Sequence, residues 1–271
     1  TQGYIGYFLQ NDTGGIDQIR SITSDFGYIV RIGDVTGDGL PDLLGLEYSP
    51  GALTVYNWNG STIEESQTIS VEHGGKGEVR IADVTGDGRN DVVVSTGQLY
   101  DVPDGSVLVQ SDGGSLQRPV PYDVASGADE FPNGMAVGDV SGDGIDDVVV
   151  SYGWSASGEP RLGVFPSGGA PLGSEQSVSV VSGPESLVIH DVNDDGVQDV
   201  LLSSGYSYSL ALYIGESNLG FSLAEEHDLP MTTGTLHSGD FNGDGREDII
   251  TYLVTTSSSG GGELVVLYDK E

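Results

Sequence analysis

The chain repeats one short phrase five times, and this repetition limits its possible folds more than any other feature. The phrase D-x-[TSN]-[GD]-D-G-x-x-D begins at positions 34, 83, 139, 191 and 240. Successive copies therefore begin 49, 56, 52 and 49 residues apart. Recurrence at a nearly fixed interval is the sequence signature of a repeat architecture.

Each copy lies between two apolar segments that have the character of strands. Around the second copy, "GEVRIA" (77–82) enters the phrase and "DVVVS" (91–95) leaves it. A glycine- and serine-rich turn, a third apolar segment and a fourth, more polar segment follow. Four short strands in about 50 residues, repeated radially, are typical of a β-propeller blade. We therefore expect an all-β fold, a β-propeller of four-stranded blades, built as a single domain of five repeats over residues 1–271.

The two ends of the chain leave the number of blades open. Tyr4 precedes Asp34 by the same 30 residues that separate Leu53 from Asp83, so "GYIGYF" aligns with a third strand. The C-terminal "ELVVLY" is a third strand as well. Propellers commonly combine terminal strands in one blade, because an open edge invites aggregation. We expect about five blades closed into one ring; the alternative is a fragment of, or closure into, a larger six- or seven-bladed ring.

The repeated phrase has the composition of a calcium-binding loop. Aspartates at loop positions 1, 5 and 9, with Thr, Ser or Asn at position 3, offer the hard oxygen ligands that Ca²⁺ takes six to eight at a time. Glycine at position 6 lets the backbone turn sharply, and a carbonyl near position 7 adds a ligand. The chain has no cysteine, which disfavours zinc, copper and iron; Mg²⁺, which retains several waters, is the weaker candidate. We expect about five structural Ca²⁺ sites; the alternative is turn formation alone, since Asp and Gly are ordinary turn residues.

The expected ligands are five residues in each loop. They are Asp34, Thr36, Asp38, Leu40 and Asp42; Asp83, Thr85, Asp87, Arg89 and Asp91; Asp139, Ser141, Asp143, Ile145 and Asp147; Asp191, Asn193, Asp195, Val197 and Asp199; and Asp240, Asn242, Asp244, Arg246 and Asp248.

These repeats resemble the FG-GAP/VCBS family, the calcium-loop blades of integrin α-subunit propellers and of many secreted bacterial and fungal proteins. The first copy, "FGYIVRIGDVTGDGLPDLL", places Phe26-Gly27 before a G-D-x-x-G-D-G-x-x-D-L signature. The other copies lack the Phe-Gly pair. The resemblance implies a propeller fold, bound calcium and a secreted or cell-surface location. It leaves the biological role open, because the family includes adhesion modules, lectins and polysaccharide lyases or dehydratases.

Charge and hydropathy exclude several classes of partner. The net charge is −33, which would repel the phosphates of nucleic acid and anionic membrane surfaces. No apolar run approaches the roughly 20 residues that a membrane-spanning helix needs. No signal peptide is visible at Thr1, so we interpret the sequence as a mature form or an excised domain.

Aromatic residues gather in the segments expected on the face opposite the loops. Tyrosine and tryptophan with serine, glycine and aspartate suit sugars or a protein partner, because they combine apolar faces with hydrogen-bonding tips. The alternative is that these aromatics fill gaps between blades. The candidate ligand-binding residues are Tyr48, Tyr100, Tyr152, Trp154, Tyr206 and Tyr208.

The sequence contains no recognisable catalytic motif, neither a G-x-S-x-G elbow nor a P-loop nor H-E-x-x-H. We therefore favour a non-catalytic, calcium-binding extracellular recognition or adhesion module that binds a glycan or an extracellular protein. The alternatives are a polysaccharide-acting lyase or dehydratase domain and a purely structural module of a larger secreted protein.

Overall fold

The fold was analysed in a computed structural model of the chain. It describes residues 3–7, 15, 20–24, 29–47, 51–71, 77–95, 105–122, 132–153, 159–168, 171–181, 183–205, 207–254 and 262–267. Within these residues every regular element is a β-strand, which confirms the all-β prediction. No helix in the described residues is long and apolar enough to cross a membrane.

Four consecutive antiparallel sheets have the four strands expected of a blade. In each sheet the strands pair in chain order from the inner to the outer edge. The first sheet is β3 (Ile29–Gly33), β4 (Asp42–Glu47), β5 (Ala52–Trp58) and β6 (Ile63–Ser70). The second is β7 (Val79–Ala82), β8 (Asp91–Ser95), β9 (Gly105–Leu108) and β10 (Val120–Tyr122). The third is β11 (Pro132–Gly138), β12 (Asp147–Tyr152), β13 (Arg161–Phe165) and β14 (Gln176–Ser179), and the fourth is β15 (Pro184–His190), β16 (Asp199–Ser204), β17 (Ser209–Glu216) and β18 (Gly220–Asp228).

The sheets at the two ends of the chain differ from these four. At the N-terminal end, β1 (Gly3–Tyr7) pairs with β2 (Arg20–Ser24) alone. At the C-terminal end, β21 (Asp248–Val254) pairs on one edge with β22 (Gly262–Leu267) and on the other with the short strands β19 (Thr232–Thr233) and β20 (His237–Gly239). The hairpin β1–β2 therefore corresponds to the outer half of a blade, and the last sheet to the inner three strand positions.

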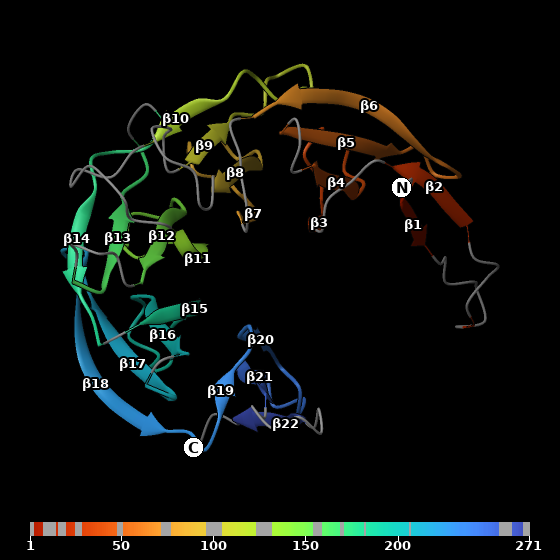
Figure 1. The fold of residues 1–271 in the computed structure, drawn as a ribbon. Helices are drawn as coiled ribbons and strands as arrows, with labels where there is room; N and C mark the ends of the chain where they lie inside the picture. The colour runs from red at the N-terminus through yellow and green to blue at the C-terminus, as the bar shows by residue number, and fades with distance from the viewer. Residues whose placement is uncertain are drawn as a thin grey trace.

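The sheets form an arc that is open between these two ends (Figure 1). In the described part of the chain β1 and β22 belong to different sheets, so no shared blade closes the arc, an arrangement that the alternative of a larger ring allows. Closure of the ring depends on the angle between successive sheets. The packing at the interfaces between sheets sets this angle, and the number of strands does not predict it. Ile32 of β3, the inner strand of the first complete sheet, is 71% exposed.

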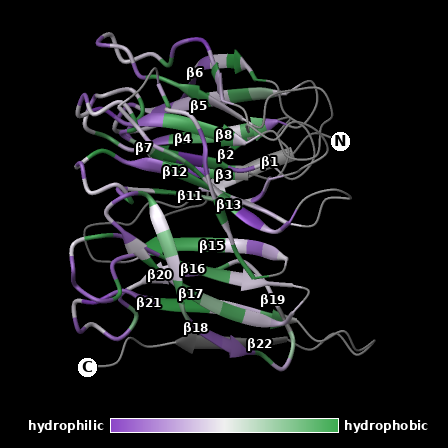
Figure 2. Cartoon of the chain, turned by 90° about the vertical axis from the view of Figure 1, so that its left-hand side faces the viewer, coloured by the Kyte–Doolittle hydropathy of each residue, from purple (hydrophilic) through white to green (hydrophobic). Residues whose placement is uncertain are grey.

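The apolar core is divided into layers, one between each pair of neighbouring sheets. The central strand β12 illustrates the reason: Val148 and Val150 pack towards the second sheet, whereas Val149 packs towards the fourth. Because alternate side chains of a strand point to opposite faces, a strand buried on both faces must be continuously apolar. The "DVVV" runs of the sequence are therefore the centres of blades. Figure 2 shows the apolar residues concentrated in the strands and the polar residues in the loops.

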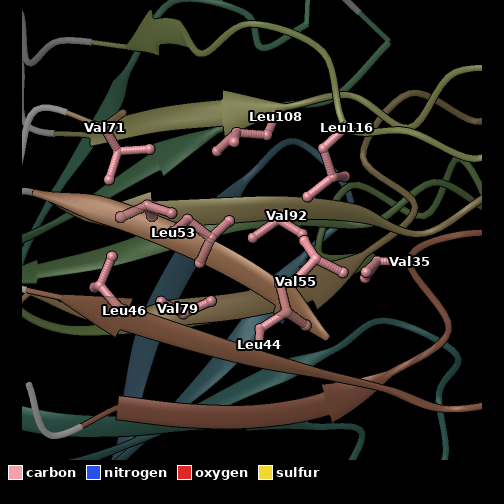
Figure 3. Packing of buried hydrophobic residues seen from close by; sticks show 11 residues of the cluster. Val35, Leu44, Leu46, Leu53, Val55, Val71, Val79, Val92, Leu108 and Leu116 are labelled. Atoms are coloured by element: carbon pink, nitrogen blue, oxygen red, sulfur yellow. The ribbon is translucent and has the colours of Figure 1, made fainter. Parts of the chain in front are cut away.

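The layer between the first two complete sheets shows how neighbouring blades are held together. Leu44, Leu46, Leu53 and Val55 of the first sheet meet residues such as Val92 of the second (Figure 3). Polar contacts join β6 to the segment between β9 and β10 in the same region. Gln67 of β6 donates to the carbonyl of Leu116 at 2.7 Å and accepts from its amide at 3.0 Å.

Candidate metal centres on the loop rim

The five Asp-rich loops join the first and second strands of five sheets, and they share one internal geometry. The aspartate at position 1 folds back over its own loop and accepts backbone N–H groups. In the third loop, Asp139 accepts from Gly142 at 2.7 Å and from Gly144 at 2.8 Å. The aspartate at position 5 accepts from the amide two residues on, as Asp143 does from Ile145 at 2.9 Å. The bonds from the amides at positions 6 and 7 recur in all the other loops.

Positive φ angles at loop positions 4 and 6 produce this fold-back. In the third loop Gly142 has a φ of 77° and Gly144 a φ of 87°. Glycine adopts this region without steric cost, which explains both glycines of the phrase. The fourth loop has Asp194 at position 4, with a φ of 58°. Aspartate is among the few other residues that visit this region, so the loop keeps its shape.

A prediction about the position-6 glycine follows from the open space around it. A Cβ at Gly144 would meet no atom within 4 Å, so Gly144→Ala should introduce backbone strain alone, roughly 1–2 kcal/mol. Gly144→Asn should cost less, because asparagine tolerates the left-handed region. Urea denaturation measures both losses. Gly113→Ala, where a Cβ would be 3.8 Å from Ser111 Oγ, is the control and should be close to neutral; equal losses at the two glycines would contradict the strain argument.

The aspartate at position 9 is the buried member of each loop. Asp42, Asp91, Asp147, Asp199 and Asp248 are at most 1% exposed. In most loops this carboxylate accepts from the amides at positions 2 and 3; Asp147 Oδ2 accepts from Val140 at 3.1 Å and from Ser141 at 2.9 Å. Its other oxygen, Oδ1, accepts from the amide of Ser167 at 2.7 Å. Asp91 and Asp199 accept in the same way from Gln110 and Gly215. In these three loops the position-9 aspartate therefore ties the loop to the end of the third strand of its sheet.

Burial and mutual repulsion disfavour the ionised form of these carboxylates. Desolvation raises the pKa of Asp42, Asp91, Asp147 and Asp199, and the negative charge of other aspartates in the same loop raises it further. Backbone hydrogen bonds act in the opposite direction. A cation within the loop would offset both the desolvation and the repulsion.

The loops offer the oxygen ligands that calcium needs, although their carboxylates do not point to one common centre. Among the described residues no three Asp, Glu or His side chains form a group ready to hold a metal ion. Most loop carboxylate oxygens instead accept backbone amides, as described above. Two buried oxygens, Asp42 Oδ1 and Asp91 Oδ2, have no hydrogen-bond partner in the described part of the chain. The predicted side-chain ligands at positions 1, 3, 5 and 9 all offer an oxygen atom, as Ca²⁺ requires.

Hydrogen bonds between successive loops gather them on one rim. Asn90 of the second loop donates to the carbonyl of Asp34 in the first at 2.9 Å. Asp146 of the third loop donates its amide to the carbonyl of Asp83 in the second at 3.2 Å. Both donors occupy loop position 8, which is not among the predicted ligand positions. Asn57, at the end of β5, contacts Thr36 and Asp38 through its amide nitrogen, at 3.2 Å in each case.

The aromatic candidates do not assemble into a described binding face. Tyr152 is fully buried, with the Arg161 guanidinium 4.1 Å from its ring centroid, so it packs between sheets as the alternative interpretation stated. Tyr208 is 42% exposed. Tyr48, Tyr100, Trp154 and Tyr206 lie outside the described residues.

Comparison with known proteins supports the repeat assignment. The family model for the FG-GAP-like repeat matches residues 34–94 and 191–251. Each match begins at position 1 of one Asp-rich loop and runs through the whole of the next Asp-rich loop, so four of the five loops lie within the matched residues. The chain carries FG-GAP-like repeats. A search of curated protein sequences gave no match.

Solved structures resemble these FG-GAP-like repeats in fold at low sequence identity. A functionally unknown protein from Desulfotomaculum acetoxidans is 12% identical with a TM-score of 0.60, over 97% of this chain and 75% of the other. A protein from Lactobacillus plantarum is 14% identical with a TM-score of 0.54, over 98% and 82%. The V. cholerae biofilm matrix protein Bap1 is 17% identical with a TM-score of 0.48; the match covers 88% of this chain and 37% of Bap1.

Proposed function

We propose that the chain is a non-catalytic, calcium-binding recognition module that acts outside the cell. The observation that carries the proposal is the shared fold-back of five Asp-rich loops, each with a buried carboxylate at position 9. Turn formation alone does not require a third carboxylate that is desolvated and repelled by its neighbours. The calcium is structural in this proposal, because each loop joins two strands of one sheet and a bound ion would staple them.

The proposed ligands of each ion come from the five positions predicted from the sequence. The carboxylates at positions 1, 5 and 9 would turn part of their oxygens from backbone amides towards the ion. Side chains at position 3 and carbonyls at position 7 would complete the oxygen shell. Sites of this kind in extracellular modules bind calcium with dissociation constants of about 0.1–1 mM. That range suits a secreted or cell-surface location.

Calcium titration tests the proposal. Isothermal titration calorimetry should detect about five Ca²⁺ per chain. At a free concentration about a hundredfold above Kd, each occupied site should add roughly 2.7 kcal/mol to the free energy of unfolding, so calcium should raise the melting temperature and EDTA should lower it again. Asp143→Asn should remove one site. Asp228→Asn on the exposed outer strand β18 is the control and should leave the stoichiometry unchanged; absence of both calcium heat and stabilisation would refute the proposal.

The recognition partner in this proposal is a glycan or an extracellular protein. The support is compositional, since no described face concentrates aromatic side chains. A glycan array probed in calcium, with a parallel assay for unsaturated products on acidic polysaccharides, separates a glycan-binding module from an enzyme.

A further inference from the structure

A cavity of about 680 Å³ lies where the inner strands of five sheets converge. Residues of β3, β7, β11 and β15 line it, together with the segment 235–238 that leads into β20. Figure 1 shows these inner strands facing the middle of the arc. We call this space the axial cavity. It is separate from the Asp-rich loops, none of whose fifteen aspartates line it.

Two guanidinium groups meet at the wall of the axial cavity. Arg31 of β3 donates from Nε to the carbonyl oxygen of Val79 at 3.0 Å. Arg80 of β7 donates from Nη1 to the same oxygen at 3.1 Å. Because both side chains share one acceptor, their positive charges must be neighbours. Burial lowers the pKa of Arg31 and the charge of Arg80 lowers it further, whereas the charge of Glu78 raises it.

The negative charge at this wall does not balance the two arginines. Glu78 is the one carboxylate among the described residues that line the axial cavity, and it forms an ion pair with Arg80. Arg31 has no carboxylate at ion-pair distance in the described part of the chain; its other recorded bond goes to the carbonyl of Val30 at 3.0 Å. In the whole chain 42 acidic residues outnumber nine lysines and arginines. At this wall the ratio is reversed, because two arginines lie beside one glutamate.

The remaining wall would accommodate the uncharged part of a small molecule. Ala136, Val137, Leu187 and Ile189 line it, and His237 lies on the side formed by the last sheet. An Arg guanidinium is a planar fork that matches carboxylate and sulfate oxygens. We propose that the axial cavity binds a small ligand through an oxyanion, a carboxylate or a sulfate group, held by Arg31 beside Arg80. This site goes beyond the proposed calcium function and does not depend on it.

Calorimetric titration with three probes tests the site, with calcium and ionic strength held constant. Sodium glucuronate presents a carboxylate, sodium sulfate presents an inorganic oxyanion, and glucose is the uncharged match for glucuronate. We expect saturable binding of glucuronate or sulfate and none of glucose. Arg31→Gln should weaken that binding at least tenfold. Arg118→Gln removes the same charge from an exposed position and should change the affinity less than twofold.

Comparison of glucuronate with sulfate shows whether the site prefers a carboxylate or a sulfate group. Binding of either one supports the site if that binding depends on Arg31. Arg31→Lys keeps the charge and loses the fork, so it should give an intermediate affinity; this variant also serves if Arg31→Gln does not fold. Absence of binding by both oxyanions would overturn the proposal. Equal weakening by Arg31→Gln and Arg118→Gln would overturn it as well, since long-range charge alone would then explain the binding. Neither result would bear on calcium stoichiometry.

Discussion

Asp147→Ala should lower the free energy of unfolding by about 3–5 kcal/mol even in the presence of a chelator. The buried carboxylate accepts three backbone amides, those of Val140, Ser141 and Ser167. Alanine would leave these donors without a partner, and an unsatisfied buried donor costs about 1–3 kcal/mol. Urea denaturation in EDTA measures the loss without any contribution from a bound ion.

The matched control is Asp143→Ala in the same loop. Asp143 is exposed and accepts one amide, that of Ile145. In EDTA its replacement should cost no more than about 1 kcal/mol, whereas in calcium the loss should grow because a proposed ligand is missing. A large loss for Asp143→Ala in EDTA would show that position 5 is part of the metal-free scaffold, contrary to this division of roles.

Arg161→Met should destabilise the fold by a similar amount for a different reason. The Arg161 guanidinium lies over the Tyr152 ring and forms an ion pair with Glu175 at 3.5 Å between Nη2 and Oε1. The Glu175 side chain is 3% exposed. Removing one partner of a buried ion pair costs roughly 3–5 kcal/mol, because the charge that stays buried loses the opposite charge beside it.

A double variant separates that penalty from lost packing. Arg161→Met with Glu175→Leu removes both charges, so it should recover most of the stability lost by Arg161→Met alone, as apolar replacements of buried pairs often do. Thermal and urea unfolding of the two single variants and the double variant form the cycle. If the double variant were as unstable as Arg161→Met, packing against Tyr152 rather than charge would explain the loss.

The sequence was sufficient to predict the blades because each blade repeats the same local physics. The apolar run of β8 reads "DVVVS" because Val92 and Val94 face one neighbouring sheet while Val93 faces the other. The position-6 glycine was likewise predicted to allow a sharp turn, and its φ of 80–91° in the five loops agrees. Burial on both faces and backbone chirality both act within a few residues, so they leave a readable pattern.

Features that depend on the angle between blades could not be predicted in the same way. The open arc is one, since no local pattern encodes the rotation from one sheet to the next. The contact between Tyr152 and Arg161 has a different origin, because the two residues pair across adjacent strands of one sheet and Gly163 leaves the space for their side chains. A Cβ at Gly163 would approach both Glu175 Oε1, at 2.8 Å, and Tyr152 Cε2, at 2.9 Å. Arg31 and Arg80 occupy the same position of two successive repeats, 49 residues apart, so the repeat places them on neighbouring inner strands. Their contact with one carbonyl oxygen depends on how the two blades pack, which the repeat does not reveal.

The division of the core into layers between sheets has a consequence for how such a chain changes in length. Each apolar layer involves two neighbouring sheets and no others. The free energy of the fold is then close to a sum over nearest-neighbour interfaces, as in other repeat proteins. Gain or loss of one whole unit of about 50 residues replaces one interface by another of the same kind. An insertion that shifts a single strand by one residue instead turns its apolar side chains to the wrong layer. Duplication of whole units of about 50 residues therefore lengthens such an arc with little loss of folding free energy.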